Sequence, residues 1–127
     1  DFIGITNFID ASIVNQDKVF CKDIQLECNT TGIAEERSVK IAIRPESILI
    51  SQNKSNEQNC IHGTIKENEF LGSFQRLYVE SPSLSEELLM IDIANTSQTN
   101  FDLNQGSMIY FIFPPDQIKV YPNSWIF

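Results

Sequence analysis

Apolar and polar residues alternate along most of this chain, which is the period of a β-strand with one buried face. In the run 39–44, Val39, Ile41 and Ile43 share one face and Lys40 and Arg44 lie on the other. The runs 24–28 and 89–94 repeat this pattern. No window of eleven residues sustains the apolar stripe of an amphipathic helix, so the pattern predicts an all-β domain.

About ten short strands follow, separated by turns rich in Asn, Gly, Pro and Ser, which is typical of a barrel or sandwich. The predicted strands are 8–14, 18–22, 24–28, 39–44, 48–51, 61–70, 76–80, 89–94, 108–113 and 118–121. Single helical turns are expected at the start of the chain and over 83–88. The polar stretch 51–59 is expected to be a surface loop. No internal repeat of fixed period is visible.

The composition fits one folded domain, and the net charge excludes two classes of partner. The 127 residues are 42% hydrophobic, which is enough for a modest core. The formal net charge is −8 and the nine Lys and Arg residues are scattered. Because nonspecific binding to phosphates or to anionic lipids needs a basic surface, we expect neither nucleic acid nor an anionic membrane surface as a partner.

The three cysteines, Cys21, Cys28 and Cys60, are an odd number without CxxC spacing. We therefore expect reduced thiols, and neither a disulfide framework nor a structural zinc site. No stretch approaches the roughly 20 apolar residues of a membrane span. The chain starts Asp1-Phe2-Ile3 without a methionine or a signal sequence, which suggests a fragment of a longer cytosolic polypeptide.

Residues for catalysis are not evident. Nucleotide hydrolysis needs a glycine-rich loop ending in Gly-Lys-Ser/Thr, and none of the five glycines precedes a lysine. The single histidine, His62, alternates with Ile61 and Gly63 and is expected on the solvent face of a strand. The sequence predicts no catalytic residue, no metal site and no cofactor in this chain.

Five ordered motifs point to a family. They are Phe2-Ile3-Gly4 with Asn7-Phe8, Arg44-Pro45-Glu46, Phe70-Leu71-Gly72, Gly106 before an apolar strand, and 115–121 with the sequence PDQIKVY. Together they resemble the C-terminal TOBE (transport-associated OB-like) domain of bacterial ABC-importer ATPases, of the spermidine/putrescine and the ferric-iron or phosphonate types. The resemblance covers nearly the whole chain.

The resemblance implies a single OB-like (TOBE/MOP-like) regulatory domain over 1–127, built as a barrel or sandwich or as two small β-subdomains sharing strands. It implies an ATPase domain upstream that binds ATP and magnesium, a second copy of the same subunit as partner, and membrane subunits of a transporter at the cytoplasmic side of the bacterial inner membrane. The implied task is regulation and dimerisation in the import of a solute such as a polyamine or iron. The family-motif residues have structural or interface roles: Gly4, Asn7, Phe8, Arg44, Pro45, Glu46, Phe70, Leu71, Gly72 and Gly106.

Three of these features leave alternatives open. Arg44 and Glu46 either fix the turn at Pro45 or contact a partner, and the turn role predicts that Glu46→Ala costs about 1–3 kcal/mol if the carboxylate satisfies buried amides. The aromatics of 70–74 are expected in the core. The run 109–113 is apolar on both faces, so it forms either a doubly covered core strand or an interface that would include Ile109, Phe111 and Phe113.

Two further functions are alternatives to the regulatory domain. A related barrel that senses a small ligand could bind an oxyanion through backbone amides at Ser73 or at Thr30-Thr31-Gly32, although the charge of −8 opposes this. An OB module for nucleic acid would need interleaved basic and aromatic residues, which the sequence lacks.

Overall fold

A computed structural model describes residues 5–33, 37–95 and 102–123. These residues form ten strands and two turns of 3₁₀ helix, and they include no helix long and apolar enough to cross a bilayer. The all-β prediction is confirmed, and each predicted strand is present within two residues of its expected ends. In place of the helical turn expected over 83–88 there is a hydrogen-bonded turn at 82–84 and a bend at 86–87. The helical turn expected at the start of the chain falls on residues 1–4, outside the described residues.

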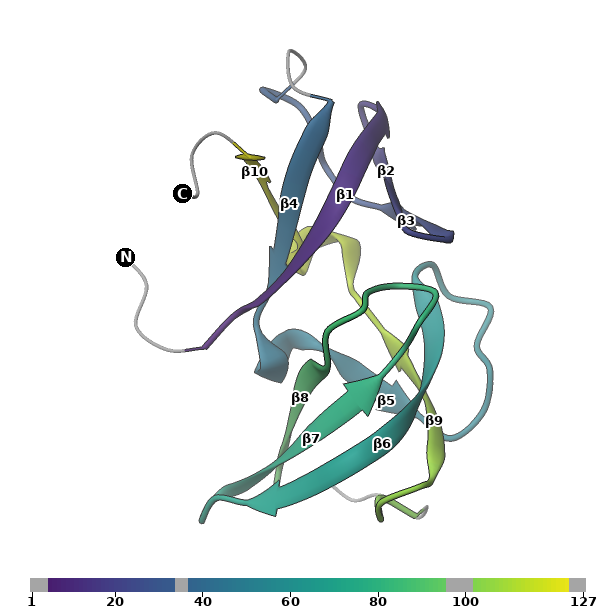
Figure 1. Cartoon of the computed structure of the whole chain (residues 1–127), viewed down its shortest axis with the longest axis vertical. Coiled ribbons are helices and arrows are strands. Elements are labelled where there is room, and N and C mark those ends of the chain that lie inside the picture. Colours follow the sequence, from purple (N-terminus) through teal and green to yellow (C-terminus); the bar gives the residue numbers. More distant parts are fainter. Residues whose placement is uncertain (1–4, 34–36, 96–101, 124–127) are drawn as a thin grey trace.

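The strands form two five-stranded sheets stacked along the long axis of the molecule (Figure 1). The first sheet has the order β10-β4-β1-β2-β3 and the second has the order β5-β9-β6-β7-β8. The bounds in the first sheet are β1 Asn7–Asn15, β2 Lys18–Cys21, β3 Ile24–Glu27, β4 Ser38–Ile43 and β10 Lys119–Pro122. Those in the second are β5 Leu49–Ser51, β6 Cys60–Phe70, β7 Phe74–Glu80, β8 Leu89–Ala94 and β9 Met108–Ile112. All neighbouring strands are antiparallel.

The two halves of the chain have the same architecture, and each gives its last strand to the other half. Strands β1–β4 are followed by the 3₁₀ turn η1 (Pro45–Ser47) and by β5, which joins the second sheet. Strands β6–β9 are followed by η2 (Pro115–Gln117) and by β10, which joins the first sheet. The expected pair of β-subdomains sharing strands is therefore confirmed as an internal pseudo-twofold arrangement.

Proline explains where both crossovers occur. Pro45 and Pro115 each occupy the first position of a 3₁₀ turn, where a missing N–H costs nothing and a fixed φ favours the bend. The first buried residue after each turn is an isoleucine, Ile48 or Ile118, and its N–H donates to the carbonyl of that proline. Ser47 and Gln117, which are equivalent in the two turns, also contact each other at 3.3 Å.

The inward residues of both sheets belong to one hydrophobic cluster, as strand alternation predicts. Its largest fully buried members are Phe111, Phe113, Leu26, Ile41, Ile43, Ile65, Leu77, Leu84, Ile91 and Ile109. Full burial of one such side chain contributes about 1.5–3 kcal/mol. This core fixes the positions of the crossovers and of the surface described next.

Candidate functional site

The junction between the sheets contains two asparagines with the same set of contacts. Asn7 begins β1 and is 5% exposed. Its Oδ1 accepts the Met90 N–H at 2.8 Å, and its Nδ2 donates to the Met90 carbonyl at 2.9 Å and to the Ile43 carbonyl at 3.2 Å. The carboxamide of the first sheet therefore pairs with strand β8 of the second sheet as a peptide group would.

Asn59 makes the equivalent contacts in the opposite direction. Its Oδ1 accepts the Glu27 N–H at 2.8 Å, and its Nδ2 donates to the Glu27 carbonyl at 2.9 Å and to the Phe113 carbonyl at 2.8 Å. Both asparagines use both donors of the amide, so each side chain is satisfied although it is buried. We call Asn7 and Asn59 the two latches.

The sequence indicated only one latch. Asn7 belongs to a family motif, but Asn59 was placed in the expected surface loop 51–59. The structure buries it at 9% exposure with a left-handed φ of 62°, a conformation that asparagine tolerates better than most residues. The internal duplication of the chain is the signal that could have revealed Asn59. It is hidden in the sequence, because Asn7 and its partner Ile43 are 36 residues apart whereas Asn59 and its partner Phe113 are 54 apart, so the two halves show no fixed period.

The Arg44-Pro45-Glu46 motif forms the first crossover. Pro45 is buried, whereas the side chains of Arg44 and Glu46 are 47% and 57% exposed and form an ion pair at 3.5 Å. No side-chain hydrogen bond caps the turn. Glu46 therefore does not satisfy buried turn amides, and the turn depends on Pro45 and on the buried Ile48.

The Phe70-Leu71-Gly72 motif lies at the exposed tip of the β6–β7 hairpin. Phe70 is 74% exposed, so the prediction that it lies in the core is wrong. Gly72 has φ 84°, and Asn95 braces the tip by donating from its backbone N–H to the Ser73 carbonyl and from its side chain to that of Gly72. The hairpin extends beyond the core, and a register shift between Ile65 and Glu67 interrupts the alternation of β6 before it reaches Phe70.

The apolar run in β9 lies inside the molecule. Ile109, Phe111 and Phe113 are each fully buried, and the rings of Phe111 and Phe113 pack with centroids 5.8 Å apart. These three side chains share one face of the strand, belong to the core and offer no surface to a partner. The other face is only partly covered, because Ile112 is buried whereas Tyr110 is half-buried and Met108 is exposed. Gly106 adopts φ 93° just before this strand, and Gly4 lies outside the described residues.

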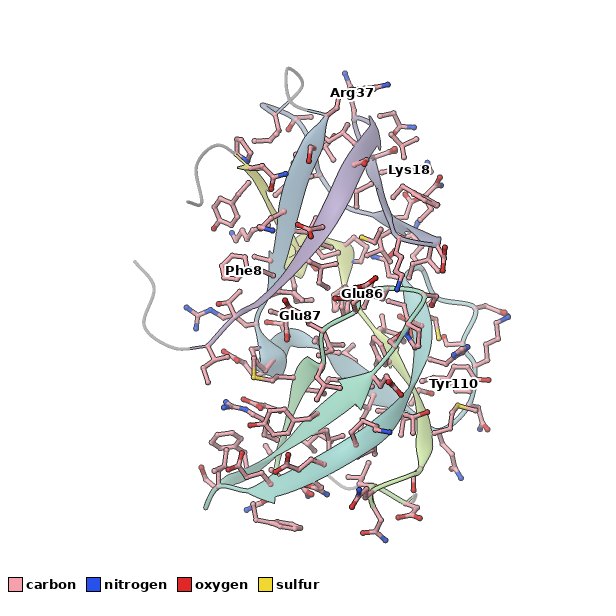
Figure 2. The ribbon with its side chains drawn as sticks, viewed as in Figure 1. Phe8, Lys18, Arg37, Glu86, Glu87 and Tyr110 are labelled. Atoms are coloured by element: carbon pink, nitrogen blue, oxygen red, sulfur yellow. The ribbon has the colours of Figure 1, made fainter. Side chains whose placement is uncertain are left out.

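Phe8 lies in a groove beside the first latch. The groove, of about 700 Å³, is lined by Phe8, Asp10, Lys22, Lys40, Leu84, Ser85, Glu86 and Glu87. Figure 2 shows Phe8 on one side of the molecule, Tyr110 on the other, and Glu86 and Glu87 between them, on the loop before β8. Lys40 pairs with Asp10, and Lys22 pairs with Glu86 at 3.5 Å, so most charges in the groove are matched within the chain.

A second groove, on the Tyr110 side, is lined among others by Gln25, Lys54, Cys60, His62 and Tyr110. His62 is exposed on the outer face of β6, as predicted, and meets Tyr110 edge-on at 6.2 Å. Over 5–33, 37–95 and 102–123 there is no group of three or more His, Cys, Asp or Glu residues that could hold a metal ion. Neither groove shows a nucleophile paired with a base.

In the segment Thr30-Thr31-Gly32, the amides of Thr30 and Thr31 are already hydrogen-bonded within the chain. The Thr30 N–H donates to the Gln16 carbonyl at 2.9 Å, and the Thr31 N–H donates to Asn29 Oδ1 at 3.0 Å. The adjacent hollow also contains the carboxylates of Asp17, Glu27 and Asp116. An oxyanion would face these carboxylates, and the Thr30 and Thr31 amides would not be free to bind it.

Comparison with known proteins identifies the family. The family model described as the TOBE domain matches residues 41–120, which is more than half of the chain. This chain belongs to the TOBE domain family. The match runs from β4 through both crossovers into β10, so it includes the exchanged strands that hold the two sheets together.

Two curated relatives carry TOBE-like segments. The chain is 25% identical over 131 residues to the Fe(3+) ions import ATP-binding protein FbpC 2 of Rhizobium meliloti, covering 95% of this chain and 33% of that protein. It is 30% identical over 80 residues to the spermidine/putrescine import ATP-binding protein PotA of Clostridium acetobutylicum, covering 63% of this chain and 22% of that protein. The TOBE chain thus spans a third or less of each relative.

Among solved structures, the cytoplasmic molybdate-binding protein ModG with molybdate bound superposes with a TM-score of 0.75, covering 91% of this chain and 95% of that chain. The sequences are 10% identical, so the likeness concerns the fold. It confirms the OB-like prediction.

Proposed function

We propose that this TOBE domain is the non-catalytic regulatory and dimerisation domain of the ATP-binding subunit of an ABC importer. The observation that carries the proposal is the alignment of 95% of the chain with a third of an import ATP-binding protein. A second import ATP-binding protein aligns over 80 residues, or 63% of the chain. The chain corresponds to one segment of such a subunit.

The surface of the domain supports a role in contact rather than in chemistry. The described residues contain no cluster that could hold a metal, and the single histidine is exposed with only Tyr110 as a ring partner. Exposed apolar side chains include Phe8, Phe20, Leu49 and Phe70. Single exposed apolar residues are common, but aromatic ones are enriched where proteins associate.

The proposed partners follow from this role. They are an ATPase domain upstream in the same polypeptide, where ATP and magnesium would bind, a second copy of the subunit, and the membrane subunits of the transporter. The complex would lie on the cytoplasmic side of the bacterial inner membrane. The transported solute is proposed only as a class, a polyamine or iron, after the names of the two relatives.

The test compares the full-length parent with a variant that lacks this domain, both assembled with their membrane subunits. A domain joined to a motor changes its rate only by favouring one conformation of that motor. We expect nucleotide binding to be kept while subunit dimerisation, basal ATP turnover or its inhibition changes. Unchanged assembly, transport, ATPase rate and inhibition would contradict the proposal.

The second candidate is a small-ligand sensor, suggested by the molybdate bound to the structural relative. The occupied amides of Thr30 and Thr31 and the nearby carboxylates weigh against an oxyanion at that segment. Native mass spectrometry with molybdate and with spermidine, each against a sulfate or sodium control, distinguishes the two. A stoichiometric complex with either ligand would favour the sensor.

A further inference from the structure

We propose that the two latches, Asn7 and Asn59, couple the two sheets into one cooperative unit, so that a displacement imposed on one sheet is passed to the other. This inference deepens the proposed regulatory function and rests on it for its biological meaning. Its physical content concerns the domain alone and can be tested without the transporter.

The latches are distinguished from other links between the sheets by their burial. The exposed links are the ion pair of Lys22 with Glu86 and the contact of Ser47 with Gln117. Water competes for such contacts, and exposed pairs contribute little to stability. The latch side chains are themselves buried, their bonds to Ile43 and Phe113 are buried, and their bonds to Met90 and Glu27 are partly buried. Breaking a latch therefore leaves peptide groups that water reaches only in part without a partner.

The latches also act on the strands that end each sheet. Strands β3 and β8 are the terminal strands on their side, each with only one neighbour in its own sheet. Asn59 pairs with Glu27 at the end of β3, and Asn7 pairs with Met90 near the start of β8. Each latch therefore bonds a backbone N–H and carbonyl that a further neighbour strand would otherwise bond, and it does so from the other sheet.

The crossovers alone do not supply this coupling. They connect β4 to β5 and β9 to β10, on the opposite side of each sheet from β3 and β8. Without the latches, the sheets would still be joined at the exchanged strands and at the core between them. The far sides at β3 and β8 would retain the backbone bond from the Asp23 N–H to the Ser83 carbonyl and exposed contacts.

The chain offers clean substitutions for the test. Asn59→Gly removes the carboxamide and keeps a residue suited to the left-handed φ of 62°. Asn7→Ala removes the other carboxamide from a regular strand position. The matched control is Asn68→Ala, because the Asn68 side chain donates to the Leu103 carbonyl at 3.0 Å and does not contact the first sheet.

The measurement is residue-resolved amide exchange by NMR, combined with thermal unfolding of the 127-residue chain. In the wild type we expect one transition, with the slowest amides of both sheets reporting the same opening. Each single variant should speed exchange of its direct partner, Glu27 or Met90, by roughly tenfold or more. In the double variant, the slowest amides of one sheet should exchange at a different rate from those of the other sheet, or thermal unfolding should show two transitions.

The control should lose stability and remain a single transition. If the double variant also unfolds in one transition, with equal loss of protection in both sheets, the latches are ordinary stabilising contacts and the proposal is overturned. If the double variant does not fold, the Asn59→Gly variant decides the question. The proposal then requires that amide protection falls more in β2 and β3 than in the second sheet, and an equal fall in both sheets overturns it. Failure of this test leaves the transporter experiment unaffected, and the reverse also holds.

Discussion

Side-chain environment decides what single residues do here, and Glu46 illustrates it. The carboxylate belongs to a family motif, but it is exposed and paired with an exposed arginine at 3.5 Å. The latch asparagines, by contrast, are buried and bond through every donor. The position of a residue in a motif therefore says less about its energetic role than its burial and its partners do.

For Glu46→Ala we expect a loss below about 0.5 kcal/mol, because exposed ion pairs are screened by solvent. This replaces the larger cost expected from a capping role. Urea unfolding of the variant beside the wild type measures it, with Ser73→Ala as an exposed control. A loss above about 1 kcal/mol would show that the carboxylate has a buried partner.

The buried thiols predict a loss of stability at high pH. Burial raises the pKa of Cys21 from an ordinary 9.0 to about 12 and that of Cys28 to about 11. The unfolded chain releases these protons near pH 9, whereas the folded chain keeps them. Their stabilising contribution is therefore complete below pH 9 and declines as the pH rises toward 11 to 12.

The urea midpoint in reducing buffer, followed from about pH 8 to about pH 11, tests this, because that interval contains the rise from the ordinary thiol pKa toward the raised values. Because lysines and tyrosines titrate there too, the informative quantity is the difference between wild type and Cys21→Ala, which should shrink as the pH rises. Cys60→Ser, at a half-buried position, serves as the control. A difference that stays constant would contradict the prediction.

At the scale of elements, strand alternation predicted nearly everything about the individual strands and little about their assembly. It identified the buried faces of β4 and β8 because the period of two is a local property. It did not predict that β5 and β10 exchange sheets, since the partner of a strand depends on contacts distant in sequence. The core prediction for Phe70 is wrong for two reasons: a register shift interrupts the alternation of β6 after Ile65, and alternation does not give the length of sheet that the core covers.

One close approach between β6 and β7 carries a prediction. A Cβ added at Gly63 would lie 2.6 Å from Val79 Cγ1 and 2.8 Å from the Glu80 carbonyl oxygen. Because one of these atoms belongs to the backbone, the strands must move apart, and Gly63→Ala should cost about 1–3 kcal/mol. Ala11, four residues after the first latch as Gly63 is after the second, shows that the equivalent position also holds a small side chain.

Thermal unfolding of Gly63→Ala against Thr64→Ala, the next residue with its side chain on the other face, measures this cost. A melting temperature unchanged from the wild type would mean that β6 and β7 separate without penalty. That result would also question the tight packing of Val79 in the core.

At the scale of the whole molecule, the domain is two half-chains that complete each other. The TOBE family could be predicted from ordered motifs, and the family model over residues 41–120 confirms it. The second latch could not be predicted, because loops of unequal length hide the duplication.

We expect the 127-residue chain neither to bind nor to hydrolyse ATP, since the sequence lacks the glycine-rich loop and lysine that hold the phosphates. Isothermal titration with magnesium-ATP and a phosphate-release assay check this, with a mock preparation as the control. Turnover that survives repurification and is absent from the mock preparation would contradict it.

The exchange of last strands has a consequence for biosynthesis. During translation, β4 emerges early, but its outer neighbour β10 is synthesised after the other nine described strands. Until then the first sheet has an unpaired edge, which is the kind of surface through which nascent chains pair with one another. The order of synthesis thus makes the final strand the step that closes the molecule, and a stalled or shortened chain would expose the edge of β4.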